Sequence, residues 1–134
     1  MKTSKSILFL SALLLMILSF DGCKKDDPEP TPAEQLVGSW KEVNYVRSGC
    51  TDAGDNETNA CTTSCETIIA SATTLTFPGE PPYSYTADGN TLSVTVGTKV
   101  VAVTIEITGT TLTTTIQDSP ADGNCKSVTT YSRV

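Results

Sequence analysis

The stretch NTLSVTVGTKVVAVTIEITGTTLTTTIQD, residues 90–118, contains the pattern that decides the fold. Along three consecutive runs, apolar side chains occupy every second position, which is the period of a β-strand with one buried face. The predicted inner face consists of Leu92, Val94 and Val96, then Val101, Val103, Ile105 and Ile107, then Leu112, Thr114 and Ile116. Threonine fills many outward positions, where a β-branched side chain suits a half-exposed pleated surface.

Short turn sequences separate these runs. VGTK at 96–99 and TGT at 108–110 predict tight hairpins, and ADGN at 87–90 predicts another, in which Gly89 can take a positive φ. Hairpins between successive strands build an antiparallel up-and-down meander. We expect strands near 37–47, 67–77 (which can divide in two), 82–87, 91–96, 99–108, 110–117 and 124–133. The sequence therefore predicts an all-β fold that closes into a small barrel of about eight strands, with no convincing helix.

The first 22 residues predict a signal peptide. Lys2 and Lys5 form a basic start, and residues 7–18 follow as an apolar run interrupted only by Ser11. A helix over this run would be roughly 18 Å long, too short for a hydrocarbon core of about 30 Å. A basic start and a short apolar core are typical of a cleaved secretory signal rather than of a membrane anchor.

Cys23 ends this region directly after the small residue Gly22. The pair resembles the lipobox of bacterial lipoproteins, in which the cysteine is lipidated and becomes the first residue of the mature chain. Phe20 and Asp21 depart from the strict lipobox pattern, and an ordinary signal peptide cleaved near Gly22 is the alternative. The resemblance implies an outer-membrane protein held by its lipid, on either the periplasmic or the cell-surface face. Two or three acyl chains would make that attachment stable.

Composition separates a tether from a domain. Residues 23–35 are charged, rich in proline and without apolar periodicity, so we expect a flexible tether there and one globular domain at 36–134. The whole chain has a net charge of −6, and no basic run follows Lys25. Since nucleic-acid affinity depends on neutralising phosphates, we do not expect a nucleic-acid partner.

Residues near both ends of the domain resemble a known family. LVGSWKEV at 36–43 resembles the first strand of lipocalins, which contains Gly-x-Trp, here Gly38 and Trp40. The segments at 73–94 and 126–134 resemble the lipocalin-like domains of small Gram-negative lipoproteins. The resemblance covers nearly all of the domain and implies that Arg133 packs across Trp40 to close the base of the barrel. The alternative is that Trp40 is a core aromatic residue of an open β-sandwich.

Beyond Trp40, strict alternation would bury Glu42 and Asn44. We therefore expect a β-bulge near Lys41–Glu42 that turns Val43 and Tyr45 inward.

Four cysteines remain after Cys23. In an exported protein, Cys50, Cys61, Cys65 and Cys125 predict two disulfides. If the last strand lies beside the first, as the resemblance implies, Cys125 falls near residue 48 and within reach of Cys50. Cys61 and Cys65 would then pair locally, although Cys65 with Cys125 remains open. We expect no metal site, because the spacing is poor for zinc and the chain has no histidine.

Catalysis finds little support in the sequence, and no cofactor motif appears. The lack of histidine removes the commonest general base, and Glu42, Asp88 and Glu106 are scattered along the chain. Two interpretations stay open. One is a carrier that binds a small apolar ligand inside the barrel. The other is a surface interaction or structural lipoprotein whose barrel is filled by its own side chains.

Overall fold

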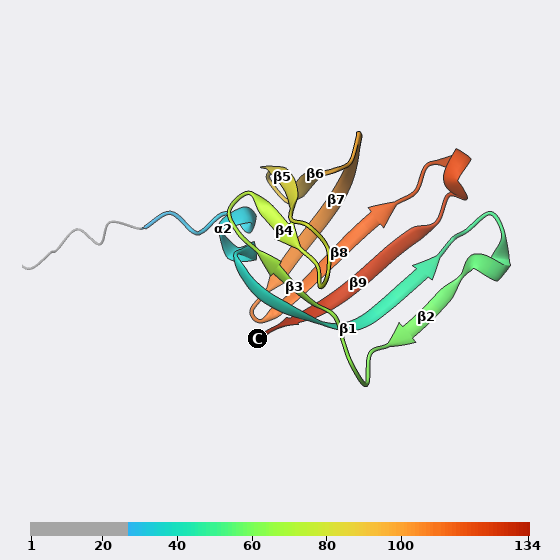
Figure 1. The fold of residues 1–134 in the computed structure, drawn as a ribbon, viewed down its shortest axis with the longest axis horizontal. Helices are drawn as coiled ribbons and strands as arrows, with labels where there is room; N and C mark the ends of the chain where they lie inside the picture. Colours follow the sequence, from blue (N-terminus) through green and yellow to red (C-terminus); the bar gives the residue numbers. More distant parts are fainter. Residues whose placement is uncertain (1–26) are drawn as a thin grey trace, which may run out of the picture.

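Nine antiparallel strands form one sheet that closes on itself (Figure 1). The computed structural model describes residues 27–134. Its strands are β1 (Gly38–Ser48), β2 (Glu57–Ala60), β3 (Thr67–Ala70), β4 (Thr74–Thr76), β5 (Tyr83–Asp88), β6 (Thr91–Val96), β7 (Lys99–Thr108), β8 (Thr111–Gln117) and β9 (Lys126–Arg133). Its helical turns are α2 (Pro32–Leu36), η1 (Ala53–Asp55) and η2 (Pro120–Asp122).

The predicted all-β meander is confirmed. Strands β3 to β9 pair in sequence order, and the pairing of β1 with both β3 and β9 closes a barrel of eight strands, with β2 left outside the ring. Gly89 turns the β5–β6 hairpin with φ +57°. The expected division of 67–77 occurs between β3 and β4. Strand β2 was not expected, because ETNA has no apolar alternation and all four of its residues are exposed.

Burial follows the alternation predicted for residues 90–118. Val103 and Ile105 are buried on β7, whereas Thr104 and Glu106 between and beyond them are exposed. The core is built from apolar and aromatic residues of nearly every strand of the ring. Its buried members are Leu36, Trp40, Ile68, Ala70, Leu75, Tyr85, Leu92, Val94, Val103, Ile105, Leu112 and Tyr131.

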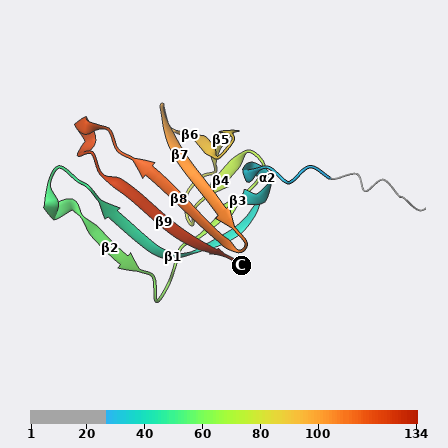
Figure 2. The same cartoon turned by 180° about the vertical axis from the view of Figure 1, so that it is seen from behind.

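Strand β1 changes partner halfway along its length. Its first half pairs with β3 through residues 38–41, and its second half pairs with β2 through residues 44–47. Along its other edge it pairs with β9 throughout. The second half of β1 therefore leaves the ring together with β2 and the ends of β8 and β9, forming an open extension that we call the flared sheet (Figures 1 and 2).

The expected bulge exists, but it lies between Glu42 and Asn44 rather than at Lys41–Glu42. Val43 is 45% exposed, so the prediction that it turns inward was wrong. The cause is the change of partner: the Glu42 N–H donates to the Glu66 carbonyl at 2.8 Å, and the Cys61 N–H donates to the Val43 carbonyl at 2.9 Å. Tyr45 pairs with Thr129, on the same face as Tyr131, and so does lie on the inner face.

Helix α2 occupies residues that the sequence placed in the tether. Pro32 opens the helix, and Thr31 and Glu34 form a reciprocal capping box at its start. Leu36, at its end, is only 1% exposed, so burial of this side chain fixes the segment against the barrel. Tertiary packing at the base thus orders a stretch whose composition resembles a linker.

The base of the barrel joins its first and last strands, β1 and β9. The Trp40 side chain is fully buried, and its Nε1–H donates to the Leu36 carbonyl at 2.7 Å. Arg133 Cζ lies over the Trp40 indole, 4.3 Å from the centroid of that aromatic ring. The Arg133 guanidinium also donates to the carbonyls of Val37 and Gln35. Gly38 has φ +142°, and a Cβ there would lie 3.0 Å from Arg133 Nη1, so the close approach requires glycine.

Two disulfides hold the flared sheet. Cys50 pairs with Cys125 across 75 residues, and Cys61 pairs with Cys65 across four. The expected disulfides are confirmed, and the alternative pairing of Cys65 with Cys125 was wrong. The long-range bond ties the end of β1 to the start of β9, and the short one closes the loop between β2 and β3.

Substitution at the base tests this closure. We expect Trp40→Ala to lower the free energy of unfolding by about 3–5 kcal/mol, the usual cost of a large buried aromatic residue. Arg133→Ala should cost less and add little to the Trp40 variant, because contacting residues share one interaction. Urea unfolding of the two single variants and the double variant measures the coupling. Lys41→Ala, an exposed change on the same strand, is the control, and fully additive losses would contradict the closure.

Removal of each disulfide separates their contributions. Loop entropy predicts a loss of about 4 kcal/mol for Cys50→Ala/Cys125→Ala and about 2 kcal/mol for Cys61→Ala/Cys65→Ala. Thermal unfolding without reductant measures both. Peptide mapping of the unreduced protein should find no free thiol among these four cysteines. An equal loss of stability in the two double variants would show that the Cys50–Cys125 bond contributes no more than the short Cys61–Cys65 bond.

Candidate functional site

An open cavity of about 430 Å³ lies at the end of the barrel opposite the Trp40 base. This volume is typical of a small-molecule pocket. Eight apolar or aromatic residues and two carboxylates line it: Leu75, Phe77, Tyr83, Val94, Val96, Val101, Val103, Ile116, Glu66 and Glu80. The interior is therefore filled at one end and hollow at the other.

The alternation on β6 and β7 produces the hollow end. Val94 pairs with Val101 across the two strands, and both side chains face inward. Closer to the base, the larger side chains of Leu92, Ile105 and Leu112 are almost fully buried. Small β-branched residues at the mouth and larger residues at the base therefore give the barrel a closed floor and an open upper space.

The segment between β4 and β5 forms one wall of the mouth. Phe77-Pro78-Gly79-Glu80 is a reverse turn in which the Glu80 N–H donates to the Phe77 carbonyl at 3.1 Å. Proline at the second position and a glycine with φ +79° at the third are typical of a type II turn. The rings of Phe77 and Tyr83 then meet edge to face, with their centroids 5.9 Å apart.

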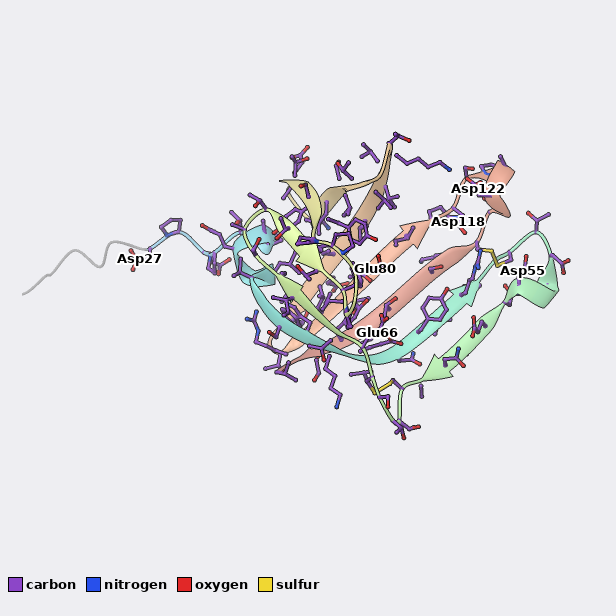
Figure 3. All side chains as sticks on the ribbon, viewed as in Figure 1. Asp27, Asp55, Glu66, Glu80, Asp118 and Asp122 are labelled. Carbon is purple, nitrogen blue, oxygen red and sulfur yellow. A yellow bond between two sulfur atoms is a disulfide. The ribbon has the colours of Figure 1, made fainter. Side chains whose placement is uncertain are left out.

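Two carboxylates lie at the entrance. Figure 3 shows Glu66 and Glu80 in the middle of the molecule, with Asp55, Asp118 and Asp122 farther out. The Tyr83 hydroxyl donates to Glu80 Oε2 at 3.2 Å. Burial, followed by the charge of Glu80 and this hydrogen bond, raises the pKa of Tyr83.

A third carboxylate faces the interior from another strand, β1. Glu42 pairs with Tyr131 across β1 and β9, so it faces the interior. Burial, with smaller contributions from Glu42 and Glu66, raises the pKa of Tyr131, and the hydroxyls of Thr129 and Thr114 oppose the shift. The two glutamates therefore act on one phenol inside the barrel.

The three carboxylates weighed from the sequence do not meet. Asp88 and Glu106 are exposed on the outer face, on β5 and β7, whereas Glu42 faces inward on β1. Cys23 lies outside the described residues. Glu66 and Glu80 were missed, because both lie in connections where no periodicity indicates direction. The Pro-Gly pair of the turn could have placed Glu80 in a tight turn, but not at the mouth.

Residues 27–134 contain no candidate metal centre and no helix that could span a membrane. No group of three histidine, cysteine, aspartate or glutamate side chains in this part of the chain lies close enough together to hold a metal ion. None of the helices found there is long and apolar enough to cross a bilayer.

The chain matches no family model, no curated protein and no solved structure. Fold and site together define a small antiparallel β-barrel with a closed base and an apolar cavity behind an acidic entrance.

Proposed function

We propose that this chain is an exported, lipid-anchored, lipocalin-like lipoprotein of the outer membrane that binds a small apolar ligand in its barrel without catalysis. The observation that carries this proposal is the apolar cavity of about 430 Å³. Val96 at its edge remains 43% exposed. Each Å² of apolar surface that a ligand removes from water would contribute about 25 cal/mol, so this cavity favours a hydrophobic guest.

The sequence before the barrel supports the anchor. Gly22–Cys23 follows the short apolar run, and the described chain enters the barrel through α2 beside the closed base (Figure 1). An extended segment from Cys23 to Thr31 reaches roughly 30 Å at about 3.3–3.6 Å per residue. A lipid at Cys23 would therefore keep the base of the barrel within roughly 30 Å of the membrane surface.

One observation favours the alternative, an interaction lipoprotein. Strand β2 lies at the end of the sheet order with all four residues exposed, and a free strand edge can pair with another chain. In that case the cavity would bind nothing, and the test below would show no ligand.

A change that fills the cavity tests the ligand function. Val101→Phe places a larger ring in the space, so binding of the neutral fluorophore N-phenyl-1-naphthylamine should weaken at least about tenfold, equivalent to 1.4 kcal/mol. The fluorescence enhancement of the probe measures this. Val100→Phe is the matched control, because that neighbour is 67% exposed on the outer face. Equal effects of the two variants, or no binding to the native protein, would contradict a ligand in the barrel.

A substitution at Cys23 tests the anchor. Cys23→Ser removes the only thiol available for acylation at the predicted cleavage site, so the protein should move from the membrane fraction to a soluble exported fraction. Fractionation with immunoblotting measures the change, and Cys61→Ser/Cys65→Ser, which leaves Cys23 intact, should remain in the membrane. A Cys23→Ser protein that still sediments with membranes would show that the anchor is not a lipid at this residue.

A further inference from the structure

The charged groups that line the cavity are both acidic. Glu66 and Glu80 are its only charged lining residues, and both are exposed at the entrance. Glu42 faces the same interior from β1. Among residues 27–134, neither Glu66 nor Glu80 takes part in a salt bridge, since the one ion pair found there joins Arg47 to Asp118.

The backbone at both lining carboxylates is fixed. The Glu66 carbonyl accepts the Glu42 N–H at 2.8 Å, and Glu66 directly follows the Cys61–Cys65 disulfide. Glu80 closes the type II turn and accepts a hydrogen bond from the Tyr83 hydroxyl at 3.2 Å. Because the backbone of each is already ordered, a partner that pairs with these carboxylates would pay less entropy than at two mobile loops.

The neighbouring cations do not neutralise this entrance. Arg47 is paired with Asp118 at 3.1 Å, and the Arg133 guanidinium lies on Trp40 at the opposite end. Lys99 pairs with Val96 across the β6–β7 hairpin, so it lies on the cavity-facing side of the sheet at the outer rim, although it is exposed and does not line the cavity. Two lining carboxylates therefore face one lysine at the rim, which leaves the mouth with a net negative charge.

We propose that the cavity selects an amphiphile with a cationic head group, of the alkylamine class, and that Glu66 and Glu80 determine this specificity. The alkyl chain lies among the valines of β6 and β7, and the ammonium group lies at the entrance between the two carboxylates. Fatty-acid anions meet like charges there and bind more weakly. This inference rests on the proposed ligand function and names the chemical class of the ligand.

The test compares three ligands that differ only in the head group. Decylamine, decanol and decanoate at pH 7.4 displace N-phenyl-1-naphthylamine from the full chain carrying Cys23→Ser, which avoids detergent. Because two exposed carboxylates each contribute a modest amount, decylamine should bind at least about tenfold tighter than decanoate. The preference should shrink in 0.5 M NaCl, where screening shortens electrostatic reach to a few ångströms.

Charge-neutralising variants locate the effect. Glu66→Gln/Glu80→Gln should bring decylamine and decanoate to within about twofold of each other while leaving decanol unchanged. Glu57→Gln/Glu106→Gln removes the same net charge from exposed positions outside the cavity and should keep the preference. Melting temperatures verify that each variant folds. If Glu66→Gln/Glu80→Gln does not fold, the unsubstituted protein tests the proposal. Its preference among the three ligands, and the dependence of that preference on salt, then give the answer.

The possible outcomes distinguish a failure of the proposed head-group specificity from a failure of the proposed ligand-carrier function. If the probe binds and the three ligands compete equally, the specificity is wrong while the apolar carrier stands. If neither the probe nor any of the ligands binds, the carrier function itself is wrong. An equal loss of preference in both double variants would assign it to the overall charge of the protein. A preference for decanoate that disappears in Lys99→Gln would assign the opposite specificity.

Discussion

Contact between the two ends of the domain closes this protein. Trp40 near the start of β1 lies under the guanidinium of Arg133 at the end of β9, 4.3 Å from the ring centroid. The same guanidinium binds two carbonyls of the α2 region, so one side chain holds the first strand, the last strand and the helix. A meander without this contact would keep two free edges and an open interior. The closed floor, and the cavity above it, depend on this closure.

The bulge at Val43 shapes the other end. Strand β1 pairs with β3 before it and with β2 after it, so the wall divides and the mouth widens. The Cys61–Cys65 disulfide closes the loop that spans this division, and Glu66 comes directly after it. Cys50–Cys125 ties the far end of the flared sheet. A covalent bond, Cys61–Cys65, therefore lies where the wall divides between β2 and β3, and Cys50–Cys125 reinforces the continuous β1–β9 pairing.

Different side-chain sizes at the base and at the mouth explain how a small barrel keeps a hollow space. Larger side chains such as Ile105 and Leu112 fill the base and supply stability, whereas valines at the mouth leave room. Unpaired carboxylates at the entrance add no evident stability, since like charges repel one another. Their placement is the basis of the proposed ligand specificity.

Local pattern was enough to predict the strands, the hairpins and the inward faces of β6 to β8, because a period of two and turn chemistry act over a few residues. The resemblance of Gly38, Trp40 and Arg133 to the lipocalin pattern pointed to the base. Tertiary structure alone decided the exposed strand β2, the ordering of α2 and the position of the bulge, because each depends on a partner distant in sequence. It also decided that Glu66 and Glu80 share one entrance, since both lie in connections whose direction depends on barrel closure.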